Sequence, residues 1–335
     1  MGFCLLVQPI HEVGSQVLAE AGIETRLASA SDMSTVAQEI PGAVAVITRN
    51  AGLSREAIAA AEDLRVIGNH GTGYDPIDVP FATERGVPVV STPEANVQSV
   101  AELAISLMLA VAKRLLPADE ATRKGLFTFK YHHPTGEIAG KTVGIVGYGR
   151  IGRRTAAILR DAFGMRVLAY SPSADAEELR AHGVTKIDRL HDLLRASDVV
   201  SLHLPLTEKS EGLIGAAELA CLKPSALLIN TSRGPVIDEP ALVQALQRHQ
   251  LAGAGLDVYV SEAMDEDDPL LALENTVLTP HIGGSSQEAL ERTAVQVAEQ
   301  VIAVLRDEHP TNLVNPEVWS RRRRVAQSGS SLNPG

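Results

Sequence analysis

The stretch that decides the fold is TVGIVGYGRIG, which occupies Thr142–Gly152. Its Gly147, Gly149 and Gly152 have the spacing G-x-G-x-x-G, after an apolar run typical of a buried strand and before a run with helical periodicity. In that context the first glycine permits a tight turn, the second lets a pyrophosphate approach the backbone, and the third allows close packing of helix on strand. Free N–H groups at the start of the helix would bind the phosphates. We therefore predict a dinucleotide-binding βαβ unit.

The chain on both sides of this unit alternates short apolar runs with helical patterns, which predicts parallel sheets covered by helices. The apolar runs are continuous, as expected for strands buried on both faces. At 335 residues the chain is longer than one hydrophobic core usually holds, so we expect two doubly wound α/β domains. The expected strands are Cys4–Val7, Val44–Thr48, Arg65–Gly68 and Pro88–Val90 in the first domain, and Thr142–Val146, Arg166–Tyr170, Asp198–Leu204, Ser225–Asn230, Gly253–Val258 and Asn275–Thr279 in the second.

The connecting and terminal segments are less regular. Long helices are expected at about Gln98–Lys113 and Ser286–Arg306, the second after a Gly-Gly pair that can serve as a hinge. Leu115–Ala139 has no clear period and contains two prolines, so we interpret it as an arm outside both cores. The tail Ser320–Gly335 has four arginines followed by Ser, Gly, Asn and Pro, which predicts disorder.

Composition excludes several classes of function. The net charge of −11 and the aromatic content of 3% argue against nucleic-acid binding. No apolar run approaches the length of a membrane span, and Phe3–Val7 is too short for the core of a signal peptide. Cys4 and Cys221 are far apart in apolar segments, so neither a disulfide framework nor a zinc site is expected. We expect a cytoplasmic protein.

The sequence does not decide whether the cofactor is NAD or NADP. Folds selective for NAD usually place Asp or Glu about 20 residues after the glycines, where the carboxylate binds the ribose hydroxyls. Here the strand Arg166–Tyr170 is followed by Ser171, Pro172 and Ser173. Neither a carboxylate nor a following arginine is present, so NAD and NADP both remain possible.

Three further segments follow expected strands of the second domain. NTSRGPVID contains Arg233, GLDVYVSE contains Asp257 and Glu262, and TPHIGGS contains His281. Ligands of open α/β sheets bind beyond the carboxyl ends of the strands, so these groups can converge beside the cofactor. Loss of hydride from an alcohol requires a base, for which histidine is suited; a carboxylate can orient its ring, and arginine matches a substrate carboxylate. These residue types are therefore compatible with hydride-transfer chemistry beside the cofactor.

These motifs, with GTGYDPID at Gly71–Asp78 and TPEANVQSVAE at Thr92–Glu102, resemble the D-isomer-specific 2-hydroxy acid dehydrogenase family over about residues 40–310. The resemblance implies a flavodoxin-like substrate domain, residues 1–97 plus 284–318, into which a Rossmann NAD(P)-binding domain, residues 98–283, is inserted. It also implies a homodimer in which the arm 115–139 embraces the partner. Residues 319–335 remain as a tail that we predict to be disordered.

The resemblance also implies residue roles. His281 is expected to be the general acid/base with Glu262 as its partner, and Arg233 to bind the substrate carboxylate and polarise its carbonyl. Ala263 follows Glu262 where the family commonly has proline, and we expect this departure to loosen the loop that carries Glu262. The substrate carboxylate is also expected to meet the backbone at Gly71, Thr72 and Gly73, and the expected cofactor contacts are Gly147, Gly149, Arg150, Ile151, Gly152, Ser171, Thr72, Ser232, Asp257 and Gly284.

The expected activity is hydride transfer between NAD(H) or NADP(H) and a small D-2-hydroxy acid such as phosphoglycerate, hydroxypyruvate or glyoxylate, with no metal. An NAD(H)-sensing corepressor-like protein of the same fold, and a formate or phosphite dehydrogenase, are the alternatives. The order of the Arg, Glu and His segments argues against a methyltransferase. His132 and His133 lie in the arm without further ligands at metal-site spacing, and His70 is a candidate for substrate specificity.

Overall fold

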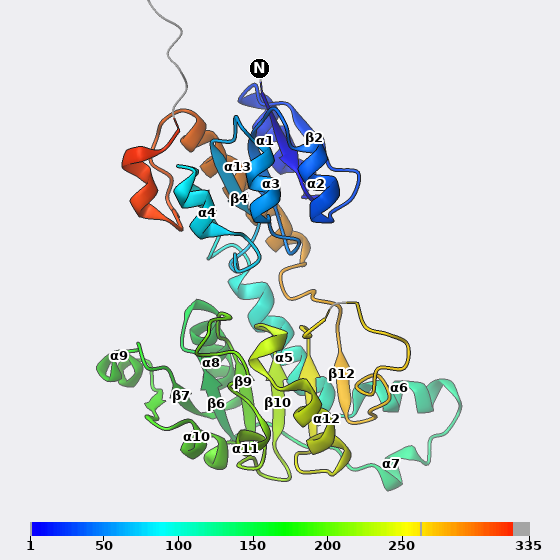
Figure 1. Ribbon diagram of the computed structural model, residues 1–335. Helices are drawn as coiled ribbons and strands as arrows, with labels where there is room; N and C mark the ends of the chain where they lie inside the picture. Colours follow the sequence, from blue (N-terminus) through cyan, green and yellow to red (C-terminus); the bar gives the residue numbers. More distant parts are fainter. Residues whose placement is uncertain (1, 262, 324–335) are drawn as a thin grey trace, which may run out of the picture. The chain divides into compact units, whose positions relative to one another are not determined.

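The computed structural model describes residues 2–261 and 263–323, which fall into two compact units. The first comprises the chain up to Asn96 and the part from Gln287 onward, and the second is Val97–Ser286 (Figure 1). Both units contain a parallel sheet covered by helices, so the predicted fold class is confirmed.

The sheet of the first unit has five parallel strands in the order β2-β1-β3-β4-β5, the flavodoxin-like order. Strands β1 and β4 are buried along their whole length, in agreement with their continuous apolar sequence. Strand β2 was not predicted, because it is short and mostly exposed and therefore has no apolar run. The elements are β1 (Phe3–Leu6), α1 (Glu12–Glu20), β2 (Thr25–Leu27), α2 (Met33–Glu39), β3 (Ala43–Thr48), α3 (Arg55–Ala60), β4 (Val66–Asn69), α4 (Val79–Glu84), β5 (Val89–Val90), α13 (Gln287–Leu305) and the 3-10 helix η2 (Pro316–Arg321).

Helix α13 completes the first unit from the far end of the sequence. It packs against α1 and β4, and its Val297, Ala298 and Val301 are fully buried. A Cβ atom at Gly68 of β4 would lie 2.7 Å from a methyl group of Val297. Glycine at this strand position is therefore what lets the helix approach the sheet so closely.

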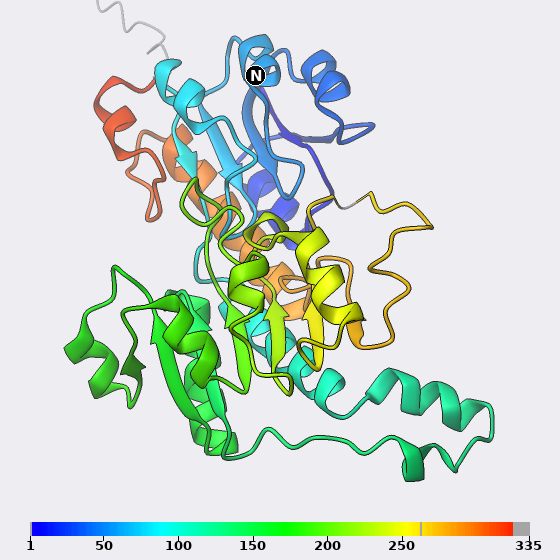
Figure 2. The ribbon, with the colours of Figure 1, turned by 60° about the horizontal axis from the view of Figure 1, so that its bottom comes forward.

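The sheet of the second unit has seven parallel strands in the order β12-β11-β10-β9-β6-β7-β8 (Figure 2). Read from β8, this is the Rossmann order 3-2-1-4-5-6 with one added strand. The two-residue strand β8 was not predicted. The elements are α5 (Val97–Ala112), α6 (Leu115–Arg123), α7 (Phe129–His132), β6 (Thr142–Val146), α8 (Arg150–Phe163), β7 (Arg166–Tyr170), α9 (Ala176–Ala181), β8 (Thr185–Lys186), α10 (Leu190–Ala196), β9 (Val199–Leu202), α11 (Ala216–Leu219), β10 (Leu227–Asn230), the 3-10 helix η1 (Gly234–Val236), α12 (Glu239–Gln247), β11 (Gly253–Leu256) and β12 (Thr276–Leu278).

The segment interpreted as an irregular arm is partly helical. It contains α6 and the short α7. Ion pairs at i,i+4 spacing, Asp119 with Arg123 and Glu120 with Lys124, stabilise α6 locally. Ala121 is the single buried residue of α6, so the helix lacks the apolar stripe by which a sequence reveals a helix.

The beginning of the predicted disordered tail is packed against the first unit. The Arg322 guanidinium lies 3.7 Å from the ring centre of Trp319, pairs with Asp307 and is 6% exposed. The Arg323 amide donates to the Gly86 carbonyl at 3.0 Å. The expectation of disorder is therefore wrong for Trp319–Arg323, because the sequence shows the charge run but not its partners; the rest of the tail lies outside the described residues. Within the described part of the chain, no helix is long and apolar enough to cross a membrane.

Candidate active site

The glycine loop between β6 and α8 has the geometry of a phosphate cradle. Gly147 has φ +94°, and a Cβ atom there would lie 2.4 Å from the carbonyl oxygen of His203. A Cβ at Gly152 would lie 2.2 Å from the Gly147 oxygen, whereas a Cβ at Gly149 would meet nothing within 4 Å. Gly147 and Gly152 are thus required for packing, and Gly149 leaves the start of α8 open. The loop fits the pyrophosphate of a dinucleotide.

At the next strand, Tyr170 of β7 accepts a hydrogen bond from the Gly147 amide at 2.9 Å, which joins the two strand ends. Ser171 follows and is 8% exposed. The structure thus places Ser171 beside the glycine loop, where a dinucleotide-binding fold has its adenosine ribose. Its side chain can donate or accept a hydrogen bond but carries no charge.

The loop that carries Arg233 is shaped by Asn230, the last residue of β10. The Asn230 Oδ1 accepts from the amide and the hydroxyl of Ser232 at 3.0 and 2.7 Å, and its Nδ2 donates to the Arg233 carbonyl at 2.9 Å. A Cβ at Gly234 would lie 1.9 Å from the carbonyl group of Tyr259, so the loop crosses directly over that backbone. Asn230 therefore fixes the backbone from which Arg233 extends. The sequence motif contained this residue, but its role depends on contacts that no spacing reveals.

The loop that carries His281 is held by Asp257, which follows β11. Asp257 is 1% exposed; its Oδ1 accepts from the Thr279 hydroxyl at 2.7 Å and the Ile282 amide at 2.8 Å, and its Oδ2 from the Gly283 amide at 2.8 Å. His281 itself has φ +52°, a left-handed conformation that is strained for a residue with a side chain. Three hydrogen bonds that one carboxylate accepts from the loop hold it in this conformation.

Burial raises the pKa of Asp257, although the hydrogen bonds from Thr279, Ile282 and Gly283 and the charge of His281 oppose the shift. Most of the acceptor capacity of this carboxylate is already occupied by its own loop. Asp257, expected only as a cofactor contact, is thus placed as the residue that positions His281.

Tyr259 connects the two strand ends beneath these loops and was not singled out from the sequence. Its hydroxyl lies 2.9 Å from the Thr279 carbonyl oxygen and 3.1 Å from that of Leu256, and the single hydroxyl hydrogen is shared between these two acceptors. Burial raises its pKa to about 12, so the hydroxyl keeps its proton at neutral pH. The signal in the sequence was slight, namely a tyrosine two residues after Asp257.

The glycine loop, Arg233, Asp257 and His281 follow the strands β6, β10, β11 and β12 and therefore share the carboxyl edge of one parallel sheet. Gly284 follows directly on the loop that Asp257 holds. Glu262 lies outside the described residues, so its role remains a prediction.

In the first unit, Gly71, Thr72 and Gly73 follow β4. The Asn69 Nδ2 donates to the carbonyl oxygens of Gly71 and Gly73 at 2.9 and 3.0 Å, and the Thr72 hydroxyl donates to Asn96 at 2.8 Å. Over residues 2–261 and 263–323, no hydrogen bond is formed by the backbone N–H groups of Thr72 and Gly73. The loop thus presents two adjacent donors at a strand end.

His70, beside this loop, is 8% exposed, and its Nε2 has no hydrogen-bond partner among the described residues. Burial, together with the nearby Arg49 charge, lowers its pKa to about 4. His70 is therefore neutral at physiological pH. In the arm, His132 is exposed and His133 stacks on Phe129 with ring centres 4.1 Å apart; the described residues contain no group of three potential metal ligands.

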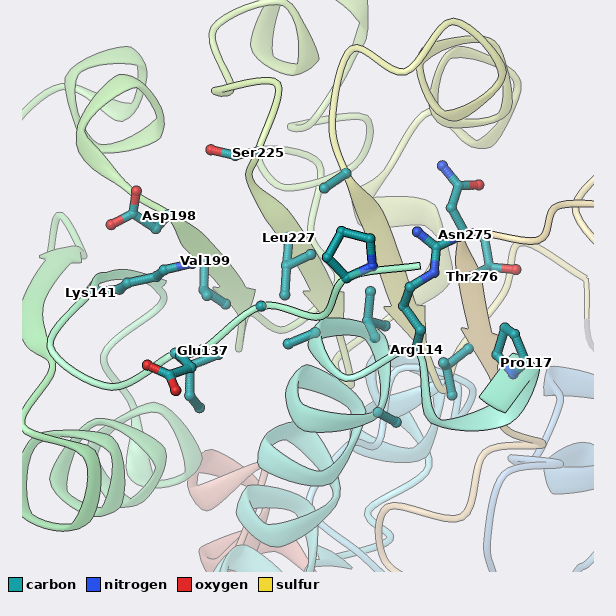
Figure 3. A pocket seen from close by; sticks show the side chains of 18 of the residues that line it. Arg114, Pro117, Glu137, Lys141, Asp198, Val199, Ser225, Leu227, Asn275 and Thr276 are labelled. Carbon is teal, nitrogen blue, oxygen red and sulfur yellow. The ribbon is translucent and has the colours of Figure 1, made fainter. Parts of the chain in front are cut away.

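A separate cavity of about 260 Å³ lies at the opposite edge of the second sheet (Figure 3). Val199, Leu227 and Thr276, the first residues of β9, β10 and β12, line it together with residues of α5 and the arm. Arg114 and Asn275 lie at one end, and Lys141 and Asp198 at the other. This cavity is therefore distinct from the residues at the carboxyl edge.

Comparison with known proteins identifies the family. Residues 105–283, more than half of the chain, match the model described as D-isomer specific 2-hydroxyacid dehydrogenase, NAD binding domain. The chain belongs to this family. Within it, the chain is 44% identical over 271 residues to a glyoxylate reductase of Korarchaeum cryptofilum, covering 79% of this chain and 80% of that protein.

A second relative is the D-3-phosphoglycerate dehydrogenase of Methanocaldococcus jannaschii, 38% identical over 312 residues. The match covers 93% of this chain but 59% of the length of that relative. Among solved structures of similar fold is an NADPH-dependent glyoxylate/hydroxypyruvate reductase from Sinorhizobium meliloti in complex with NADP and malonate. It is 29% identical with a TM-score of 0.86, and the match covers 97% of this chain and 99% of that one. Members of the family are thus named as NAD(P)-linked oxidoreductases of 2-hydroxy and 2-keto acids.

Proposed function

We propose that this chain is an NAD(P)-dependent D-2-hydroxyacid dehydrogenase that interconverts a small 2-hydroxy acid and its 2-keto acid. The observation that carries the proposal is that the glycine loop, Arg233 and the strained His281 loop all lie on the carboxyl edge of the second sheet. In this proposal the second unit binds the cofactor and the first contributes to substrate binding.

The nicotinamide, when bound, supplies or accepts the hydride. His281 removes the hydroxyl proton as the alcohol is oxidised and returns it to the carbonyl oxygen in the reverse direction. The planar guanidinium of Arg233 pairs with the substrate carboxylate and polarises the reacting carbonyl. In this proposal Glu262 is the partner of His281 and stabilises the imidazolium, the role that the family resemblance implies. Asp257 keeps the histidine loop in its strained conformation in both directions of the reaction.

The backbone N–H groups of Thr72 and Gly73 bind the same substrate carboxylate in this proposal. Their lack of partners within the described chain supports it, because two adjacent N–H groups suit an anion. The cofactor is held by the glycine loop, with the further contacts expected from the sequence: Arg150, Ile151, Ser171, Thr72, Ser232, Asp257 and Gly284. The substrate class is that of the named relatives, and glyoxylate, hydroxypyruvate and phosphohydroxypyruvate are the keto acids to test.

The test is an absorbance assay of nicotinamide oxidation, with NADH and NADPH each combined with every one of these keto acids. We expect turnover with at least one pair, and Arg233→Gln should raise KM for the keto acid far more than it changes the affinity for the cofactor. Arg248→Gln, an exposed arginine at the end of α12, is the matched control and should behave as wild type. Tight cofactor binding without turnover on any acid would contradict the proposal and favour a nucleotide-sensing protein.

We also propose that the protein is a cytoplasmic homodimer formed through the arm. The supporting observation is the exposure of large apolar side chains there: Leu115, Leu116, Leu126, Phe127 and Tyr131 are all more than half exposed. Arg114 and Pro117, which flank Leu115 and Leu116 in the chain, line one end of the cavity of Figure 3, and the Nε of Arg114 is buried without a hydrogen-bond partner within the described chain. A second copy of the chain would cover the apolar residues and offer Arg114 an acceptor. Light scattering should give twice the chain mass for wild type, and a monomer for Phe127→Asp; a wild-type monomer would contradict the proposal.

A further inference from the structure

The adenosine end of the cofactor site contains a charged pair that the sequence did not reveal. Arg153 lies in the first turn of α8, and its Nε donates to the carbonyl oxygen of Tyr148 at 3.3 Å. Tyr148 is the residue between the first two glycines of the fingerprint. The Nη1 of the same guanidinium forms an ion pair with Glu178 of α9. Arg153 therefore spans the glycine loop and the helix that follows the end of β7.

These two segments border the ribose of the adenosine in a dinucleotide-binding fold. An acidic residue at the end of β7 would repel a phosphate on the ribose 2′-oxygen, but Ser171 is uncharged. Arginine near this position is the usual partner for that phosphate. Here the arginine comes from the helix after the glycines and not from the end of β7.

The ion pair is weak enough to be exchanged. The side chains of Arg153 and Glu178 are 42% and 37% exposed, so water screens their attraction. A phosphate offers two negative charges and several acceptor oxygens to the same guanidinium. Of the neighbouring cations, Arg180 pairs with Glu177 of its own helix and Lys186 donates to the Ala174 carbonyl at 2.7 Å, whereas Arg153 also contacts the glycine loop.

We propose that Arg153 binds the 2′-phosphate of NADP(H) and that Glu178 competes with this phosphate for the guanidinium. The chain then uses NADPH through Arg153, and the carboxylate of Glu178 limits the preference over NADH. This inference rests on the proposed cofactor site and specifies its selectivity. It concerns cofactor affinity, not the hydride-transfer step.

The test compares two probes that differ by one phosphate, adenosine 2′,5′-bisphosphate and 5′-AMP, in calorimetric titrations of the full chain. Wild type should bind the bisphosphate on the order of 10-fold more tightly than AMP, as one charge-assisted contact implies. Arg153→Gln should remove this difference while leaving AMP binding unchanged, and Glu178→Gln should enlarge it. Arg153→Lys, which keeps the charge without the planar fork, should give an intermediate ratio.

Arg154→Gln is the matched control, because Arg154 is the adjacent exposed arginine and its Nε donates to Gln98 on α5 at 2.5 Å. It should retain the wild-type ratio. A ratio unchanged by Arg153→Gln, an equal loss for both probes, or the same change in Arg154→Gln would overturn the inference while leaving the cofactor site intact. Failure of wild type to bind AMP, NADH and NADPH would overturn the proposed function and this inference together. Melting temperatures of the variants show whether each is folded.

Discussion

The Arg233 loop and the His281 loop lie at the same sheet edge, and each is held by hydrogen bonds to one side chain, neutral in the first loop and ionisable in the second. Asn230 holds the Arg233 loop with an amide that both accepts and donates, whereas Asp257 holds the His281 loop with a carboxylate that only accepts. The amide does not titrate, but the pKa of Asp257 is raised by burial. The arginine loop is therefore held independently of pH, while the loop bearing the proposed proton-transferring histidine depends on a buried ionisable group.

The largest effect is expected from Gly234 in the arginine loop, with Gly283 in the histidine loop as its comparison. Gly234→Ala would place a methyl group 1.9 Å from the Tyr259 carbonyl group, so the backbone must move, at a cost of about 3 kcal/mol or more in the free energy of unfolding. Gly283→Ala would bring its methyl only to 3.0 Å from Asp257 Oδ2, and we expect about 1 kcal/mol. Urea denaturation measures both. Equal losses would mean that the arginine loop is not the more tightly packed of the two.

A reciprocal exchange should disrupt each loop in its own way. Asp257→Asn leaves at least one amide hydrogen facing another N–H, and Asn230→Asp places a carboxylate oxygen against the Arg233 carbonyl. Each should lower the free energy of unfolding by about 1–3 kcal/mol, the cost of an unsatisfied buried group. The first should chiefly lower kcat, through His281, and the second should chiefly raise KM for the keto acid, through Arg233. A main effect on KM in Asp257→Asn and on kcat in Asn230→Asp would contradict these roles of the two loops.

The two exchanges should respond to pH in opposite directions. Because the pKa of Asp257 is raised in the folded state, the folded chain binds its proton more tightly than the unfolded chain, and this residue's contribution to stability is lost as pH rises through the folded pKa. The free energy of unfolding of the wild type, relative to that of Asp257→Asn, should therefore increase as pH falls from about 7 to about 4. Asn230→Asp should instead recover toward wild type at low pH, because a protonated Asp can donate to the Arg233 carbonyl. Urea denaturation midpoints of the wild type and both variants, measured across this pH range, test the prediction. If the midpoints of all three proteins change with pH in parallel, the prediction is contradicted.

The smallest effect is expected at the hydroxyl that joins the two strand ends. Tyr259→Phe removes the hydrogen bonds to the Leu256 and Thr279 carbonyls and should cost about 1 kcal/mol. It should lower kcat slightly, because Thr279 also bonds to Asp257. Thermal unfolding and steady-state kinetics measure the two effects, and a loss as large as that of Gly234→Ala would contradict this ranking.

The sequence predicted the features whose signals are local. The glycines of the βαβ unit and the buried strands could be recognised because spacing and apolar runs carry the information. Strand β2 was not predicted because it is short and exposed. Helix α6 was not predicted because ion pairs stabilise it and it has no apolar stripe. Asn230 and Tyr259 escaped because their roles depend on where a carbonyl lies after folding. The Arg153–Glu178 pair joins residues 25 positions apart, which no motif specified.

The role of His281 is tested by the steady-state kinetics of His281→Gln with the keto acid that the wild type reduces fastest, and by the affinity of the variant for the reduced cofactor. If His281 supplies the proton, kcat/KM should fall by about 10²–10⁴ while cofactor affinity and melting temperature stay near wild type. A variant that retains most of the wild-type kcat/KM would contradict the central claim that this strained histidine is the acid–base group.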